Sequence, residues 1–368
     1  MSQAHTPHAS TSPDIAWSDP ERAARFSTWL TQVAPQHALH PQTLRLASAD
    51  ASFRRYFRID SSQGSCIIMD APPQLENCQP FVKVAQLMTK AGLRAPEVLA
   101  WDEPLGFMLL TDLGNKTMMQ VIDKDNPGAN LPLYLQAVDA LITWQLSSSP
   151  DVLPPYDEAL LRRELELFPE WYLGRHKGLT VAGEMRLTLD KAFAQIIATN
   201  LAQPSVFVHR DFMPRNLMAP VPSERPPEGA RALGVLDFQD AVYGPITYDI
   251  ASLMRDAFLS WDEAFCLDVT VRYWQKARQA GLPVGDDFGE FYRGVEWMGL
   301  QRHLKVAGIF ARLTLRDGKP HYLADTPRFA TYIRNTCARY RELKPLLRLV
   351  EQAEGYVEPE VFGFGRQS

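Results

Sequence analysis

The pattern of apolar residues changes character near Gly114, and this change limits the folds that the chain can adopt. Before Gly114 the apolar residues form short runs typical of β-strands, at residues 43–47, 55–59, 65–70, 97–102 and 106–113. A helix can start at Ser18, where Ser-Asp-Pro-Glu supplies a cap, an early proline and first-turn acids. A second helical pattern, at residues 80–92, lies between the third and fourth runs. Five strands with one internal helix predict an antiparallel sheet that carries a helix on one face.

After Gly114 long amphipathic helices dominate. They are predicted at residues 131–147, 157–173, 181–201, 247–259, 262–280, 288–313 and 326–342. Only residues 205–240 interrupt them, with two short apolar strands separated by a Pro-rich segment. The sequence thus predicts an α+β fold with two lobes, a small antiparallel β-sheet lobe and a larger, mostly helical lobe.

The expected lobe boundaries follow from the same patterns. The β-rich lobe spans residues 18–113 and the helical lobe spans residues 114–355, with a hinge near residues 111–116. Residues 1–17, rich in Ser, Thr, Pro and His, are predicted to be disordered, and residues 356–368 form a second tail.

Composition and charge exclude several classes of protein. A chain of 368 residues is too long for one small core. Its content of 46% hydrophobic and 22% charged residues is typical of a soluble globular protein. The net charge of -5 argues against a nucleic-acid or anionic-membrane partner. No apolar run approaches the length of about 18 residues that a membrane helix needs, and the first residues do not resemble a secretory signal. Four scattered cysteines predict free thiols in a reducing cytoplasm.

Polar residues follow both short strands of the helical lobe. Asp211 and Asn216 lie on a loop directly after the first strand, and Asp237 ends the second. We expect the two strands to be neighbours, which would bring the three side chains to one end of them. Asn216 and Asp237 offer oxygen ligands that suit Mg²⁺, and Asp211 can accept a proton from a substrate hydroxyl. This division of roles is the one that phosphoryl transfer needs.

These residues carry a resemblance. His209-Arg210-Asp211 with Asn216, followed by Asp237-Phe238-Gln239-Asp240, resembles the catalytic and metal-binding segments of the protein-kinase-like fold. The stretch from Gly244 to Ala251 is similar to the aminoglycoside phosphotransferase branch. The N-terminal segments SADASFRRYFRI, IIMDAPP, AGLRAPEVLAWD and GFMLLTDLG further resemble the anomeric N-acetylmuramate/N-acetylglucosamine kinases of bacterial peptidoglycan recycling.

The resemblance implies a role for each matching residue of the helical lobe. Asp211 would be the catalytic base, and Asn216 would be a Mg²⁺ ligand together with Asp237. His209 and Arg210 would support the loop. Asp249 would anchor that loop through backbone hydrogen bonds, although its position also fits an ordinary helix cap.

The resemblance also implies a nucleotide-binding role for the β-rich lobe. The backbone of Thr111, Asp112 and Leu113 would contact adenine, and the hairpin at residues 48–55, with Ser52, would cover the phosphates of ATP.

The chain departs from the kinase-like pattern at the phosphate clamp. Its third strand contains no Lys and the following helix contains no Glu, although these two residues usually form an ion pair there. We expect one of Arg54, Arg55 and Arg58 to bind the phosphates in place of the missing Lys, because the forked guanidinium of Arg suits phosphate oxygens. Alternation places Arg54 and Arg58 on one face and Arg55 on the other. The three arginines also fit a solvated strand surface.

The predicted function is that of an ATP- and Mg²⁺-dependent kinase acting on the anomeric hydroxyl of both amino sugars. The product would be a sugar 1-phosphate for cell-wall biogenesis. The enzyme would be a cytoplasmic monomer with a small-molecule substrate and no nucleic-acid or membrane partner. Alternatives are a related kinase for an aminoglycoside, choline or homoserine, and a non-catalytic nucleotide-binding protein, which the missing Lys suggests.

Overall fold

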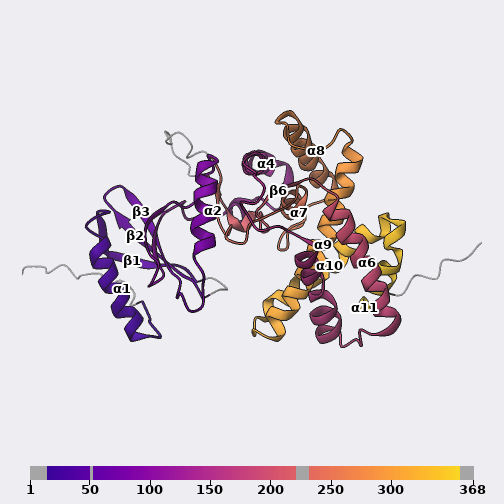
Figure 1. The fold of residues 1–368 in the computed structure, drawn as a ribbon, viewed down its shortest axis with the longest axis horizontal. Coiled ribbons are helices and arrows are strands. Elements are labelled where there is room, and N and C mark those ends of the chain that lie inside the picture. Colours follow the sequence, from indigo (N-terminus) through magenta and orange to yellow (C-terminus); the bar gives the residue numbers. More distant parts are fainter. Residues whose placement is uncertain (1–14, 50–52, 221–231, 357–368) are drawn as a thin grey trace, which may run out of the picture. The chain divides into compact units, whose positions relative to one another are not determined.

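The computed structural model describes residues 15–49, 53–220 and 232–356, and the chain divides into two compact units (Figure 1). The β unit contains the described residues up to Thr117 and those within Met218–Asp240; the helical unit contains Met118–Leu217 and the described residues from Ala241 onward. The chain therefore passes between the units three times. The sequence predicted one crossing, and it placed residues 218–240 in the helical lobe.

The β unit is built on a five-stranded antiparallel sheet with the order β1-β2-β3-β5-β4. The strands are β1 (Leu39–Ala49), β2 (Arg55–Ser61), β3 (Gly64–Asp70), β4 (Val98–Asp102) and β5 (Phe107–Thr111). All five predicted strands are present, and the predicted antiparallel sheet is confirmed.

Two helices cover opposite faces of this sheet (Figure 1). On one face Phe57 and Ile59 of β2 form a buried core with Phe26 and Trp29 of α1 (Pro20–Val33). On the other face lies α2 (Gln79–Lys90), the helix predicted between the third and fourth strands. Because side chains alternate along a strand, the residues of β2 divide between these two helices.

The first helix begins where its sequence signals predict. The side chain of Asp19 accepts hydrogen bonds from the backbone nitrogens of Glu21 and Arg22, and Pro20 occupies the first helical position. Just before it, Trp17 packs against Phe57 at 5.9 Å between ring centroids. This tryptophan falls within residues 1–17, of which residues 1–14 lie outside the described part of the chain.

Helices make up most of the other unit. They include α3 (Met118–Val121), α4 (Leu131–Leu146), α5 (Glu158–Leu165), α6 (Gly183–Leu201), α7 (Tyr248–Met254), α8 (Glu263–Gln279), α9 (Phe288–Leu315), α10 (Thr326–Arg339) and α11 (Lys344–Glu354). The prediction of one continuous helix at residues 157–173 is wrong. The helix is interrupted after α5 and continues as a π-helical segment, η2 (Phe168–His176), because Pro169 has no N–H to donate.

The long helix α9 packs closely against η2 and its flanking residues. A Cβ atom at Gly308 would lie 2.4 Å from the carbonyl oxygen of Leu167, so only glycine allows this approach. Farther toward the start of α9, the Gln301 side chain donates a hydrogen bond to the carbonyl oxygen of Leu161. These contacts fix α9 along α5 and η2.

The short strands pair differently from the prediction. β6 (Ser205–Val208) pairs antiparallel with β9 (Val242–Pro245), while β7 (Leu217–Met218) pairs with β8 (Gly234–Val235). The expectation that the strands leading to Asp211 and Asp237 are neighbours is therefore wrong. The sequence signal for β9 was missed because Gly244 and Pro245 are rare inside strands.

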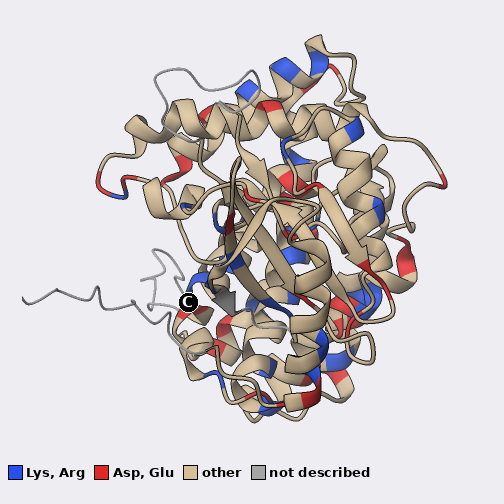
Figure 2. Ribbon diagram, turned by 90° about the vertical axis from the view of Figure 1, so that its left-hand side faces the viewer, with Lys and Arg blue, Asp and Glu red and all other residues tan. Residues whose placement is uncertain are grey.

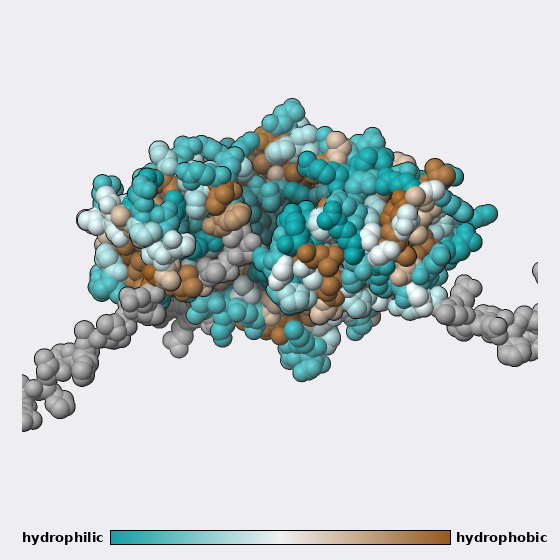
Figure 3. All heavy atoms as spheres, turned by 90° about the horizontal axis from the view of Figure 1, so that it is seen from below, coloured by the Kyte–Doolittle hydropathy of each residue, from teal (hydrophilic) through white to brown (hydrophobic). Residues whose placement is uncertain are grey.

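The surface is that of a globular protein of mixed charge. Basic and acidic positions are interspersed (Figure 2), and the face seen in Figure 3 is largely hydrophilic with small separate apolar groups. Among the described residues, no helix combines the length and apolar character needed to cross a membrane. All four cysteines are free thiols, as predicted.

Candidate active site

The loop between β6 and β7 carries the residues expected to perform the chemistry. Both carboxylate oxygens of Asp249, at the start of α7, accept backbone hydrogen bonds from this loop, from His209 N at 2.7 Å and Arg210 N at 3.0 Å. Arg210 adopts a left-handed backbone conformation, with φ of 77°. The hydrogen bonds predicted for Asp249 are present, and its importance for activity remains a prediction.

Asp249 is fully buried. Burial raises the pKa of its carboxyl, and the two backbone hydrogen bonds offset only part of this effect, which leaves the pKa at about 7. This value already includes the nearby charge of Asp211, which also raises the pKa.

Asp211 and Asn216 are connected within the loop. The amide nitrogen of the Asn216 side chain donates to the carbonyl oxygen of Asp211 at 2.9 Å, and the backbone nitrogen of Asp211 donates to Nδ1 of His209 at 3.2 Å. The Asp211 side chain retains 39% of its surface exposed. The expected base is therefore accessible while its backbone is held on both sides.

A cation on α9 was missed by the sequence analysis. Arg302 is only 1% exposed, and its Nη2 lies 3.8 Å from Oδ1 of Asp211. Lys305 lies three positions later, on the same face of the helix. Desolvation alone would raise the pKa of Asp211, but the charges of Lys305 and Arg302, with those of His209 and Arg210, lower it overall.

A buried carboxylate balances part of this positive charge. Glu164 of α5 forms ion pairs with Arg210 and with Lys305, the latter at 3.1 Å, and accepts a hydrogen bond from the Tyr156 hydroxyl. Burial would raise the pKa of Glu164, yet Lys305 and Arg210 lower it. The network connects Arg210, expected to support the loop, to two helices. No local sequence signal marks Glu164, because it sits in an ordinary amphipathic pattern.

Asp237 belongs to the β unit and follows β8. Its backbone is left-handed, with φ of 63°, a conformation that Asp tolerates better than most residues. Gln239 donates a hydrogen bond to its Oδ1 at 2.9 Å. The next residue, Phe238, is fully buried and packs on Phe81 of α2 at 5.0 Å between centroids. Phe238 thus anchors the segment of Asp237 to α2.

The donor atoms of the two expected metal ligands fit Mg²⁺. Asp237 carries a carboxylate. The amide nitrogen of Asn216 donates to the Asp211 carbonyl oxygen, and the amide oxygen is the atom that a metal would use. Mg²⁺ prefers such hard oxygen ligands and few of them from protein. Asn216 and Asp211 lie in the helical unit and Asp237 lies in the β unit.

The segment expected to contact adenine begins with Thr111, the last residue of β5. The Asp112 carboxylate binds Arg58 through Nε at 2.6 Å and Nη2 at 3.1 Å, and Ser65 at 2.7 Å. Desolvation would raise the pKa of Asp112, but these hydrogen bonds lower it. The carbonyl oxygen of Leu113 accepts from Arg94 at 2.7 Å, and the backbone nitrogen of Thr111 donates to Glu97. The Leu113 carbonyl oxygen thus already accepts one hydrogen bond within the β unit.

Each arginine expected near the phosphates has an acidic partner. Arg54 pairs with Glu76 at 3.1 Å, Arg55 with Asp70 at 2.6 Å, and Arg58 with Asp112. Arg54 is buried, so the alternative of a merely solvated strand charge does not apply to it. Ser52 lies outside the described residues.

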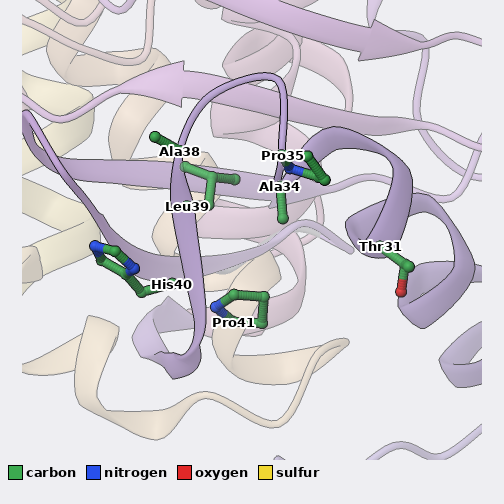
Figure 4. A pocket seen from close by; sticks show the side chains of 7 residues that line it. All are labelled: Thr31, Ala34, Pro35, Ala38, Leu39, His40 and Pro41. Carbon is green, nitrogen blue, oxygen red and sulfur yellow. The ribbon is translucent and has the colours of Figure 1, made fainter.

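A separate surface pocket lies where α1 leads into β1 (Figure 4). It is lined by Thr31, Ala34, Pro35, Ala38, Leu39, His40 and Pro41. No carboxylate lines it, so it does not offer the acidic oxygen ligands that bind Mg²⁺.

The fold and the loop residues define a kinase-like phosphotransferase, and comparison with known proteins agrees. Residues 43–287 match the phosphotransferase enzyme family, and the chain belongs to this family. It is 47% identical to the N-acetylmuramate/N-acetylglucosamine kinase of Pseudomonas aeruginosa over 340 residues, which cover 90% of this chain and 97% of the relative. The enzyme of the same name from Neisseria meningitidis is 46% identical over 342 residues, or 92% and 98% of the two chains.

Solved structures support the fold assignment. The ethanolamine kinase of Plasmodium vivax matches with a TM-score of 0.57 at 10% identity, over 86% of this chain and 87% of that one. The aminoglycoside phosphotransferase APH(2'')-Ib matches with a TM-score of 0.54 at 13% identity, over 82% and 96%. At such identities the likeness concerns the fold alone.

Proposed function

We propose that the protein is an ATP- and Mg²⁺-dependent kinase that phosphorylates the anomeric hydroxyl of N-acetylmuramate and N-acetylglucosamine. One observation carries the choice of substrate: identity of 47% over 90% of this chain with a kinase named for these two sugars. The sugar 1-phosphate product would enter peptidoglycan recycling. We further propose that the enzyme works in the cytoplasm as a monomer.

The surroundings of the loop residues support the roles that we propose for them. Asp211 accepts the proton of the attacking hydroxyl, and the cations around it support this role because they keep the carboxylate ionised at neutral pH. Asp249 and the network of Glu164 hold the loop that carries this base. Asn216 and Asp237 hold Mg²⁺, which when bound neutralises charge on the ATP phosphates.

The alternative acceptors have weaker support. An ethanolamine, choline, homoserine or aminoglycoside kinase would share the fold, but the solved structures named for such activities are only 10% and 13% identical to this chain. A non-catalytic nucleotide-binding protein would not need Asp211, Asn216 and Asp237 together. The amino-sugar kinase therefore remains the proposal.

A coupled assay of ADP release tests the proposal. We expect turnover with N-acetylmuramate and N-acetylglucosamine, and not with choline, homoserine or an aminoglycoside. Phosphorus NMR of the product should show an anomeric phosphate. The matched control is the methyl glycoside of N-acetylglucosamine, which lacks the free anomeric hydroxyl and should be inert. Turnover of that glycoside, or of an aminoglycoside in preference to both sugars, would contradict the proposed acceptor.

A further inference from the structure

The β unit lacks the usual cation for the ATP phosphates, since β3 contains no Lys and α2 contains no Glu. We propose that Arg54, positioned by Glu76, contacts these phosphates in place of that ion pair. The inference rests on the proposed use of ATP. It also selects one of the three arginines that the sequence left open.

The two faces of the sheet separate Arg54 from Arg55. In the strand register, Phe57 pairs with Ile68 on the face covered by α1, whereas Tyr56 pairs with Met69. Because side chains alternate, Arg54 shares the side of Tyr56, which is the side of α2. Arg55 lies on the α1 side.

The contacts of Arg55 confirm this separation. Its guanidinium lies over the ring of Trp17 at 3.9 Å and binds Asp70, a buried carboxylate that also binds Arg22 of α1. Arg55 therefore ties the residues before α1, and α1 itself, to the sheet. It is placed for a structural role on the face opposite to α2.

Arg58 lies on the α2 side, but its guanidinium is engaged near the end of β5. It forms two hydrogen bonds to Asp112 and a third, through Nη2, to the carbonyl oxygen of Gly114 at 2.7 Å. A fork held by a bidentate carboxylate and a backbone oxygen is directed away from other anions. The contacts of Arg58 therefore hold the segment after β5 in its conformation.

Arg54 is held differently. Its Nε and Nη2 both lie against Oε2 of Glu76, at 3.2 Å and 3.1 Å, while Oε1 of Glu76 accepts the backbone nitrogen of Phe53 at 3.3 Å. Glu76 thus fixes the guanidinium and also the point at which the chain enters β2. The Arg54 and Glu76 side chains are 9% and 14% exposed, so the pair is shielded from solvent. A shielded cation acts strongly on phosphate charge because little water screens it.

The pair and the segment of the expected metal ligand are both connected to the start of α2. Glu76 precedes the start of α2 by three residues, and Phe81 in the first turn of α2 packs on Phe238, the neighbour of Asp237. Arg54 and Asp237 are therefore attached to the same end of one helix, within one unit. A polyphosphate requires both a cation and a metal-binding carboxylate, and both are connected here to the start of α2. Glu76, which lies just before α2, replaces the missing Glu of that helix as the partner of the cation.

Nucleotide binding without sugar tests this inference independently of the acceptor. The dissociation constants of ATP and AMP would be measured by calorimetry for the wild type, Arg54→Gln, Glu76→Gln and, as a matched control, Arg45→Gln, whose ion pair with Asp60 is largely exposed. We expect Arg54→Gln to weaken ATP binding by about 10- to 100-fold, the loss of one charge-assisted contact, and to leave AMP binding unchanged. Glu76→Gln should weaken ATP binding less, also without changing AMP binding.

Two results would overturn the inference. One is ATP binding by folded Arg54→Gln that equals the wild type. The other is an equal loss for ATP and AMP, which indicates a general structural defect. If Arg54→Gln does not fold, Arg54→Lys replaces it in the test. The retained charge should preserve more than half of the preference for ATP over AMP, and a smaller remaining preference would overturn the inference. Selective loss of ATP binding in a protein that phosphorylates neither sugar would support the inference and refute the proposed substrate.

Discussion

Arg302 of α9 places its Nη2 atom 3.8 Å from the Oδ1 atom of Asp211, although the two residues are far apart in the sequence. The Nε and Nη1 atoms of Arg302 are buried and have no hydrogen-bond partner among the described residues. Burying a guanidinium with so few partners is unfavourable for folding. Groups of this kind are frequent at functional sites, where their charge tunes a neighbour. The relationship identifies α9 as the element that controls the charge of the expected base.

Asp211→Asn should abolish turnover and preserve ATP binding. The amide cannot accept the hydroxyl proton, and loss of a general base lowers kcat by about 10²–10⁴-fold. Steady-state kinetics together with calorimetry of ATP binding measure the two effects separately. Retention of more than about a tenth of the wild-type kcat would show that another group is the base.

Arg302→Met should move the acid limb of the pH profile of kcat/KM to higher pH. The Arg302 charge favours the ionised form of Asp211, so its removal raises the pKa of the carboxyl, and the base becomes protonated at a higher pH than in the wild type. Activity near pH 8 should change less than activity near pH 5. The control is Arg272→Met on α8, where an exposed ion pair with Asp268 is lost and the profile should not move. Coincident profiles for Arg302→Met and the wild type would remove Arg302 from this role.

Asp237→Asn should raise the Mg²⁺ concentration that half-saturates activity. Asparagine tolerates the left-handed backbone at this position, where φ is 63°, so the substitution removes the charge and keeps the local fold better than alanine would. A carboxylate lost from the metal weakens its hold on the phosphates. Titration of activity with Mg²⁺ at saturating ATP measures the effect, and Asp60→Asn on β2 serves as the control. A titration curve like that of the wild type excludes Asp237 as a ligand.

Gly308→Ala should destabilise the helical unit. Alanine is favoured over glycine inside a helix by about 1 kcal/mol. Here, however, the new Cβ would lie 2.4 Å from a backbone oxygen that cannot turn aside. Overpacking typically costs about 1–3 kcal/mol, so the net free energy of unfolding should fall. Urea unfolding measures it. The control is Gly128→Ala, where the nearest atom to the added Cβ is 3.9 Å away; equal stability of the two variants would contradict close packing of α9.

Local patterns in the sequence predicted the five strands of the β unit, most of the helices and the first helix cap. The antiparallel sheet followed from alternating runs such as residues 55–59, and the start of α1 followed from Asp19 and Pro20. These predictions succeed because periodicity and capping act between residues that are close in the chain. The motif around Asp211 was found in the same way, since its residues lie on one short loop.

The tertiary structure decided which distant charges meet. Nothing in the local sequence selects Arg302 and Lys305 of α9 as partners for a loop after β6, or Glu164 as the carboxylate that balances them. Likewise, three similar arginines at residues 54, 55 and 58 acquire different partners only because the sheet turns them to opposite faces and brings Glu76, Asp70 and Asp112 to them. Composition and periodicity determine which face of an element is buried. The pairing of buried charges depends on how complete elements pack, because a charge removed from water must be compensated by whatever the fold places beside it.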